Sequence, residues 1–233
     1  MTLPILLSVP HAGLTVPPEA EPYCCLTPEE IAADGDGGAS EIYDLREHVE
    51  CFVPTDIARA IVDLNRAEDD RRRDGVIKTH TCWDVPVYHE FPPESVIEQL
   101  LAKYYRPYHS SLSEAASHAN VRLGIDGHTM AAVGPPIGPD TDTDRPPICL
   151  GDVDGRSSPE GWTRALRDCL ADAFNLEVAV NKPFRGGYIT RSHMTEMPWI
   201  QIEFSRSAFL TDAEKRARLL EALDAFCHRL SAK

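Results

Sequence analysis

The sequence predicts a three-layer α/β/α domain built on a mixed, mostly parallel sheet. Apolar runs of strand length, such as 5–9 and 199–204, alternate along the chain with segments of helical periodicity, such as 95–119 and 211–230. This alternation is typical of a sheet that is covered by helices on both faces. The 233 residues are 42% hydrophobic and contain no repeat or linker, so we expect one domain over 1–233.

Strands are expected where short apolar runs end at turn-forming residues. The run from Ile5 to Val9 is the first, and Pro10 ends it because proline cannot donate a ladder hydrogen bond. The other strands are predicted at 51–53, 57–64, 121–125, 176–180, 188–190 and 199–204. The stretch 131–158, rich in proline, glycine and aspartate, is expected to be an extended loop over the sheet, and its action as a lid is a hypothesis.

Helices are predicted from capping residues and apolar stripes. They are expected over 27–34, 40–49, 95–119, 158–174 and 211–230. Within the longest of the middle helices, Pro107 removes the hydrogen-bond partner of the Lys103 carbonyl and is expected to kink the helix there.

The charge of the chain limits its partners. A net charge of −14 at pH 7 argues against a nucleic-acid-binding surface, which needs a concentrated basic stripe. We therefore expect a small-molecule substrate and no nucleic acid. If that substrate is anionic, local arginines must attract it against the repulsive field of the whole chain.

The cysteines and the N-terminal segment indicate the compartment. Seven cysteines without a C-x-x-C spacing form a poor disulfide framework and a poor cysteine-zinc site. Residues 1–9 lack a basic start, and no apolar run approaches the roughly 18 residues of a membrane helix. We expect a cytoplasmic protein with reduced thiols and no membrane partner.

Polar side chains cluster at the ends of several predicted strands. They are His11, the pair Asn65-Arg66, Asp126 with His128, and Glu203. In open α/β sheets, ligands bind beyond the carboxyl ends of the strands. We therefore expect these side chains to contribute to one site.

These residue types suit a catalytic zinc ion, which takes two or three His, Asp or Glu ligands and keeps a position open. His11 and His128 can supply two nitrogens, and Asp126 can orient His128. The acidic turn at 34–36 offers a carboxylate as the third ligand. Glu203 would then be the general base that activates water.

Structural roles remain open for the same residues. His11 alone could cap a loop, and Glu203 could form an ion pair with Arg206. His109, beside the expected kink, is interpreted as a packing or capping residue, and His193 as a loop residue at the mouth of the site. No H-E-x-x-H motif is present, so spacing alone indicates a metal site only weakly.

Six stretches between residue 5 and about residue 209 have a pattern typical of one enzyme family. They are Ser8-Val9-Pro10-His11-Ala12-Gly13, Asp63-Leu64-Asn65-Arg66, Tyr105-Arg106-Pro107-Tyr108-His109, Asp126-Gly127-His128-Thr129, the run from Asn181 to Arg191, and Ile200-Gln201-Ile202-Glu203. Together and in this order they resemble the N-formylglutamate amidohydrolase family, which is related to zinc carboxypeptidases and aspartoacylases. The resemblance implies a phosphorylase/hydrolase-like, zinc-carboxypeptidase-like fold. It also implies hydrolysis of N-formyl-L-glutamate to formate and L-glutamate, a step of histidine degradation.

Carried over residue by residue, the resemblance implies one zinc ion per chain, held by His11 and His128. The acidic stretch of the family matches residues 36–41 and implies Asp36 as the third ligand. The sequence departs from the family there, because Ser40 stands in place of a second aspartate. Asp34 therefore remains an alternative ligand.

Arginines are expected to bind the charged parts of the substrate. The pair Asn65-Arg66 resembles the substrate-carboxylate clamp of aspartoacylases, and an arginine fork donates two parallel hydrogen bonds to a carboxylate. Arg59 resembles their oxyanion-stabilising arginine, although it could instead pair with Asp56 or a surface acid.

The glycine pair that precedes residue 188 is expected to let the backbone approach the ligand. Gly187 would form that part of the site, and Arg185 or Arg191 would reach a second carboxylate. Arg191 could equally be an exposed charge at a strand end.

Two other functions are consistent with the sequence. One is a related amidase or carboxypeptidase acting on peptide or peptidoglycan fragments, against which the arginine-rich site and the lack of a signal peptide argue. The other is a non-catalytic binding protein that retains the fold, against which the joint presence of His11, His128 and Glu203 argues.

Overall fold

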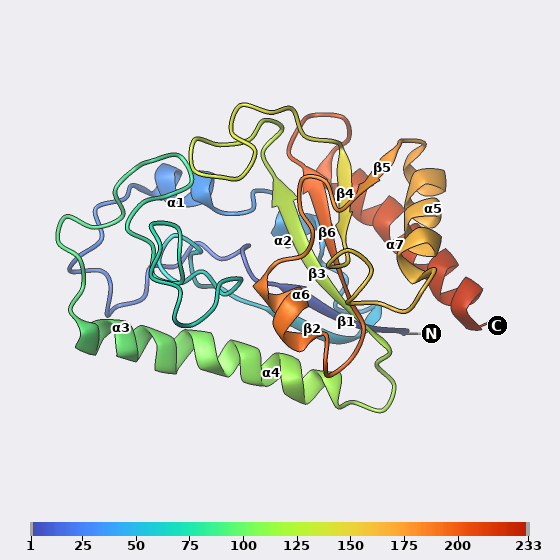
Figure 1. Cartoon of the computed structure of the whole chain (residues 1–233), viewed down its shortest axis with the longest axis horizontal. Helices are drawn as coiled ribbons and strands as arrows, with labels where there is room; N and C mark the ends of the chain where they lie inside the picture. Colours follow the sequence, from blue (N-terminus) through green and yellow to red (C-terminus); the bar gives the residue numbers. More distant parts are fainter. Residues whose placement is uncertain (1, 232–233) are drawn as a thin grey trace.

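The computed structural model describes residues 2–231, which form a six-stranded sheet between two layers of helices (Figure 1). The strands are β1 Leu3–Val9, β2 Val49–Pro54, β3 Leu123–Met130, β4 Ile148–Gly151, β5 Val178–Val180 and β6 Trp199–Ser205. In the order β2-β1-β3-β6-β4-β5, the first four strands are parallel, and β4 and β5 run the other way. The predicted mixed, mostly parallel sheet is confirmed. Residues 1, 232 and 233 of the expected domain lie outside the described part.

The helices form the two outer layers and two short turns near the site. They are α1 Pro28–Asp34, α2 Ala39–Ile42, α3 Glu94–Leu100, the π-helical turn η1 Leu101–Tyr105, α4 Arg106–Ala116, α5 Trp162–Phe174, α6 Tyr188–His193 and α7 Asp212–Ser231. Helices α5 and α7 cover one face of the sheet, and α3, α4 and α6 cover the other (Figure 1). No helix within residues 2–231 is long and apolar enough to cross a membrane.

Both faces of the sheet are buried, which explains the unbroken apolar run of β1. Ile5 and Leu7 pack with the core under α5 and α7, whereas Leu6 packs with the core under α3 and α4. Strands that are buried on both faces read as continuous apolar runs. In β6, Ile200 and Ile202 also face the first core, which leaves the intervening residues on the opposite face.

Two predicted strands are not part of the sheet. Residues 57–64 form turns that contain only isolated bridges, from Ile57 to Thr15 and from Ala58 to Gly13. This run is apolar because it is buried under α3 and α4, not because it pairs with a strand. Residues 188–190 are the first turn of α6, and so short a run has no periodicity that separates a strand from a helix.

Other boundaries shifted as well. Strand β4 lies inside 131–158, where its four residues are hidden among loop-forming ones, so a lid remains a prediction for 131–147 only. Strand β3 continues to Met130, which places the motif 126–129 inside the strand and not beyond its end. The helix expected over 40–49 ends at Ile42, and β2 begins at Val49.

The helix is irregular near Pro107, as expected, but it has a π-helical turn there and no sharp kink (Figure 1). The π-helical turn η1 contains Lys103, whose carbonyl is the one that proline deprives of a partner. Figure 1 shows α3 and α4 as one nearly continuous rod. The extra residue of a π turn therefore accommodates the proline without a sharp break.

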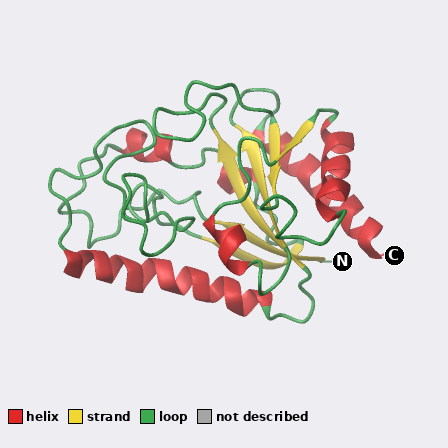
Figure 2. Cartoon of the chain, viewed as in Figure 1, coloured by secondary structure: helices red, strands yellow, loops and turns green. Residues whose placement is uncertain are grey.

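The loops that carry polar residues lie beside the sheet, on the side of α3 and α4 (Figure 2). The turn after α1 is attached to the end of β1, because the Asp36 amide donates to the His11 carbonyl at 3.0 Å. This contact fixes an acidic turn next to the first strand end.

Close packing between β3 and β6 gives a test of the fold. A Cβ atom on Gly124 would lie 2.3 Å from the ring of Trp199, which is fully buried. We expect Gly124→Ala to lower the free energy of unfolding by about 1–3 kcal/mol, the usual cost of overpacking. Urea denaturation measures this loss. Gly138→Ala is the control, since its Cβ would meet nothing closer than 3.6 Å, and an equal loss in both variants would contradict this packing.

Candidate metal and substrate site

Two histidines and one aspartate come together at the carboxyl ends of β1 and β3. One ligand atom from each of His11, Asp36 and His128 lies within 4.8 Å of the other two, and all three residues are buried. The Asp36 Oδ2 atom is 3.0 Å from Nδ1 of His128 and 3.6 Å from Nδ1 of His11. The Thr129 amide donates to the same oxygen and fixes the carboxylate against β3.

The outer nitrogen of each histidine faces a second carboxylate. Nε2 of His11 is 2.8 Å from Oδ1 of Asp63, and Nε2 of His128 is 3.0 Å from Oδ2 of Asp126. A metal-binding histidine is held in this way, because the Nε2–H donates outward and the Nδ1 lone pair is left for the ion. His11 Nδ1 is buried and has no hydrogen-bond partner in the described part of the chain, as expected of an atom that binds a ligand. The described residues therefore fit a divalent metal ion.

The structure brings Asp36, and not Asp34, to the two histidines. The Asp34 carboxylate accepts from Lys78 Nζ at 2.8 Å and from the Cys82 amide at 2.7 Å. Burial alone would raise the pKa of Asp34, but Lys78 and Arg59 outweigh it and lower that pKa to about 2. Asp34 is thus a structural anion behind the cluster.

The exposed Ser40 on α2 lies outside the His11–Asp36–His128 cluster. The departure from the family pattern at this position therefore leaves the three candidate ligands in place.

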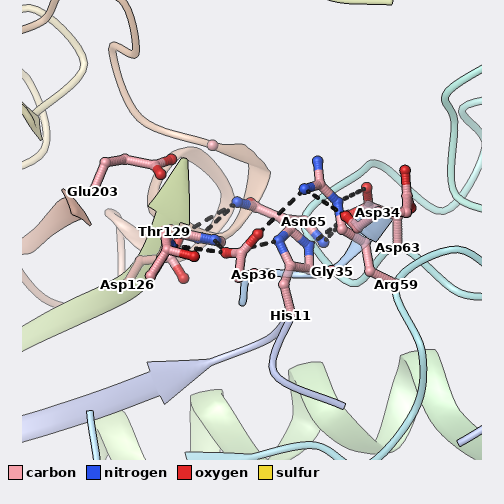
Figure 3. A network of polar contacts seen from close by, with 12 residues as sticks. His11, Asp34, Gly35, Asp36, Arg59, Asp63, Asn65, Asp126, Thr129 and Glu203 are labelled. Carbon is pink, nitrogen blue, oxygen red and sulfur yellow. Dashed lines mark hydrogen bonds and ion pairs between the residues drawn. The ribbon is translucent and has the colours of Figure 1, made fainter. Parts of the chain in front are cut away.

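A network of buried charges supports the cluster (Figure 3). Arg59 donates from Nε to Asp63 and from Nη1 to Asp36, at 3.2 and 3.3 Å. Lys78, only 1% exposed, lies 3.5 Å from Asp63 as well as beside Asp34. Burial would raise the pKa of Asp63, but His11 and the neighbouring cations hold it well below its usual value.

Asp63 and Lys78 have no role predicted from the sequence. Asp63 is the first residue of the motif 63–66. Its Oδ1 accepts a hydrogen bond from the Asn65 amide at 3.0 Å. That position could have indicated an orienting carboxylate. Lys78 has no comparable signal, since only the fold shows that this loop lysine is buried.

Glu203 lies beside the cluster on β6. It is in register with His128 of the adjacent parallel strand, so the two side chains project from the same face. Burial raises the pKa of Glu203 to about 7, and the Asp36 charge adds to this although His128 opposes it. Glu203 accepts from Gln201 Nε2 at 2.7 Å, whereas Arg206 donates to the Gly35 carbonyl. The alternative of an ion pair with Arg206 is therefore wrong.

The cluster and Glu203 open into a cavity of about 640 Å³. Its lining includes seven arginines: Arg59, Arg66, Arg72, Arg145, Arg185, Arg191 and Arg206. Among residues 2–231, only three acidic residues line it, namely Asp36, Asp74 and Glu203. The cavity is therefore locally cationic in an acidic protein, which suits a small anionic ligand.

The residues expected to bind substrate all line this cavity, but they are held differently. Arg66 donates to the Asp74 carboxylate at 3.2 Å, and Arg185 is 70% exposed beside Asp154. Arg191 donates to the Gly186 carbonyl and, within residues 2–231, forms no ion pair. Burial, with the charges of Arg66 and Arg72 next, lowers the pKa of Arg191, so its charge is poorly compensated.

The side-chain amide of Asn65 is engaged within the protein. Its Oδ1 accepts from the Ile189 amide at 2.8 Å, and its Nδ2 lies 3.4 Å from Oδ2 of Asp126. A Cβ on Gly187 would lie 2.1 Å from Asn65, so glycine is required here by close approach. This geometry favours a supporting role for Asn65.

The model of the N-formylglutamate amidohydrolase family matches residues 3–210. The chain belongs to this family. An N-formylglutamate deformylase from Pseudomonas putida is 25% identical over 91% of this chain and 84% of its own, and one from Pseudomonas aeruginosa is 26% identical over 98% and 91%.

Solved structures confirm the fold of the family in this chain. The N-formylglutamate amidohydrolase of Ralstonia eutropha superposes with a TM-score of 0.80 at 20% identity, covering 99% of this chain and 93% of its own. A gene product of Agrobacterium tumefaciens gives a TM-score of 0.74 at 20% identity, with coverages of 99% and 90%.

Zinc binding by chelator-treated protein tests the cluster. We expect Asp36→Ala to abolish tight binding, and Asp126→Ala to weaken it about 10- to 100-fold because His128 loses its orienting partner. Asp126 and Asp36 outweigh burial and raise the pKa of His128, so zinc must displace a proton and its affinity must fall as pH falls. Calorimetric titration measures both effects. Asp44→Ala, at an exposed ion pair, is the control, and wild-type affinity in Asp36→Ala would exclude this site.

The raised pKa of Glu203 makes a prediction about stability. The pKa of this carboxyl group rises from 4.5 to about 7 on folding. Between these two pH values, the metal-free folded state therefore holds one proton that the unfolded state has lost. The stability that depends on this proton is fully present below pH 4.5. It is lost as pH rises through 7, because the buried carboxyl group must then carry a charge. Above pH 7, Glu203→Gln should therefore stabilise the metal-free protein by about 1–3 kcal/mol relative to its effect at pH 5. Urea denaturation at the two pH values checks this, and a pH-independent difference would contradict it.

Proposed function

We propose that the chain is a zinc-dependent amidohydrolase that cleaves N-formyl-L-glutamate to formate and L-glutamate. The observation that carries this proposal is the buried His11–Asp36–His128 cluster, which opens with Glu203 into an arginine-lined cavity. Membership of the family and the deformylase relatives support the same substrate. The same proposal includes a cytoplasmic location, because the seven cysteines have no C-x-x-C spacing and form a poor disulfide framework.

Zinc is the metal that fits these donors best. Two imidazole nitrogens and one carboxylate oxygen are a typical catalytic zinc set, which keeps a position open. Bound there, zinc would polarise the amide carbonyl and favour ionisation of water at neutral pH. Asp63 and Asp126 keep both imidazoles in the tautomer that such binding needs.

Glu203 is the proposed general base. A pKa near 7 suits proton transfer at neutral pH, because the group can accept the proton of water and return it to the leaving amine. The Gln201 amide fixes one carboxylate oxygen by donating to Oε1, which leaves the other oxygen for the proposed proton transfer.

Arg59 is proposed to stabilise the oxyanion of the tetrahedral intermediate. Its Nε and Nη1 atoms donate to Asp63 and Asp36, which fixes the guanidinium plane next to the cluster. A preorganised donor of this kind costs no reorganisation during the reaction. Arg59 thus pairs with the buried carboxylates of Asp63 and Asp36, and the alternative of a pair with Asp56 or a surface acid is wrong.

Arginines at the other end of the cavity are proposed to bind the two carboxylates of the substrate. Arg66 and Arg191 are the main candidates, because Arg191 lacks a carboxylate partner of its own within the described residues. Arg185 is exposed at the rim and can contribute to attraction. Asn65 and Gly187 belong to the same wall and support it.

Hydrolysis assays with and without added zinc test the function. We expect release of formate from N-formylglutamate, with much slower cleavage of N-acetylaspartate and of a dipeptide. Glu203→Ala should lower kcat by at least about 10²-fold, the usual contribution of a general base, while zinc content stays at one ion per chain. Equal activity in metal-stripped protein would refute a zinc-dependent reaction, and preference for the dipeptide would favour a peptidase.

Substrate charge gives a separate prediction. N-formylglutamine retains the formyl amide but lacks the side-chain carboxylate, so it should bind weakly to a cavity that uses two arginines. Arg191→Gln should lower kcat/KM for N-formylglutamate by about 10- to 100-fold, the value of a lost charged hydrogen bond. The discrimination between the two substrates should shrink in that variant. Steady-state kinetics measures both, and undiminished discrimination would place the second carboxylate elsewhere.

A further inference from the structure

The motif at 105–109 takes no part in the proposed chemistry, yet it contacts the segment 64–66, which carries the proposed substrate-binding residue Arg66. Tyr105, at the end of η1, donates from its hydroxyl to the Arg66 carbonyl at 2.7 Å. His109, four residues later on α4, lies with Nε2 3.0 Å from the Leu64 carbonyl. One face of this helix therefore holds the backbone on both sides of Asn65.

The other nitrogen of His109 continues this chain of contacts to α6. Nδ1 of His109 is 2.9 Å from Nε2 of His193, and the two rings are nearly coplanar at 6°. Nδ1 of His193 is 2.9 Å from Oε2 of Glu196, whose other oxygen accepts from the Ser113 hydroxyl. His193 is thus buried in a relay, and its predicted place in a loop at the mouth of the site is wrong.

The hydrogen-bond partners of His109 determine which of its ring nitrogens carries the proton. A carbonyl only accepts, so His109 must carry its proton on Nε2, and its Nδ1 then accepts from His193. Burial, with the charge of His193 next, lowers the pKa of His109 to about 4, so this ring is neutral. Nδ1 of His193 faces the Glu196 carboxylate at 2.9 Å, so His193 links His109 to Glu196.

This relay joins the two sides of the proposed anion-binding wall, which is the part of the cavity lining that carries Arg66 and Arg191. Helix α6 carries Arg191, and its Ile189 amide donates to the side chain of Asn65. Segment 64–66 carries Arg66. The relay and the Asn65 contact are thus two separate attachments between the elements that position these arginines.

We propose that Tyr105, His109, His193 and Glu196 form a positioning relay that sets Arg66 and Arg191 relative to each other and so determines the affinity for a dicarboxylate substrate. The inference rests on the proposed function and deepens it by assigning the motif at 105–109. These residues touch neither the candidate metal ligands nor the reacting groups. Their loss should raise KM and leave kcat and zinc affinity nearly unchanged.

The test combines ring spectroscopy with kinetics. In ¹⁵N spectra of the histidine rings of the full chain at pH 7, we expect a neutral His109 that carries its proton on Nε2. His193→Gln keeps a donor toward His109 but removes the ring contact with Glu196, and should raise KM for N-formylglutamate about tenfold with kcat within about twofold, the effect of one weakened hydrogen-bonded link. Glu196→Gln should act in the same direction. His118→Gln, an exposed histidine outside the relay, is the matched control.

The outcomes separate this inference from the proposed function. A proton on Nδ1 of His109 in the wild-type spectrum, or a fall in kcat together with zinc loss in His193→Gln, overturns the relay. Calorimetric titration with L-glutamate measures the anion-binding wall without catalysis. If wild-type protein does not hydrolyse N-formylglutamate but His193→Gln still weakens L-glutamate binding about tenfold, the relay stands and the proposed function fails. An equal Kd for wild type and His193→Gln overturns the relay whatever the hydrolysis assay shows.

Discussion

The site depends on one buried carboxylate, that of Asp63. It accepts from the His11 ring and the Arg59 guanidinium, and it lies close to the Lys78 ammonium. A carboxylate without exposure is tolerated only where charges and donors compensate it, so these contacts require one another. The loop that carries Asp63 is thereby tied to the first strand end, and the cavity wall at 64–66 is tied to the candidate metal ligands.

The sequence predicted the layers of this fold and the central residues of the site for one physical reason. Apolar runs such as 5–9 favour buried strands, and a histidine that closely follows such a strand is expected at the sheet edge where ligands bind. The alternation in β6 likewise separates Glu203 from its isoleucine neighbours. Local pattern was sufficient wherever burial and period agree.

Local pattern failed where tertiary contacts decide the outcome. The run 57–64 is as apolar as a strand, yet its partners are helices and loops. The choice between Asp34 and Asp36 depends on Lys78, which is far away in sequence and whose burial only the fold reveals. For the same reason, no spacing rule could show that Asn65 binds a backbone amide or that His193 meets His109.

The π-helical turn η1 has a consequence for how this chain can vary in length. Such a turn holds one residue more than an α-helical turn over the same rise, and each residue of an α-helix rotates the next by about 100°. Removal of a single residue from 101–105 would place Pro107 within a regular α-helix, where its ring clashes with the carbonyl four residues earlier, and would turn Tyr108 and His109 away from the sheet. Such a deletion would thus disturb both the helix and the site, so the length of this segment is constrained more tightly than its composition.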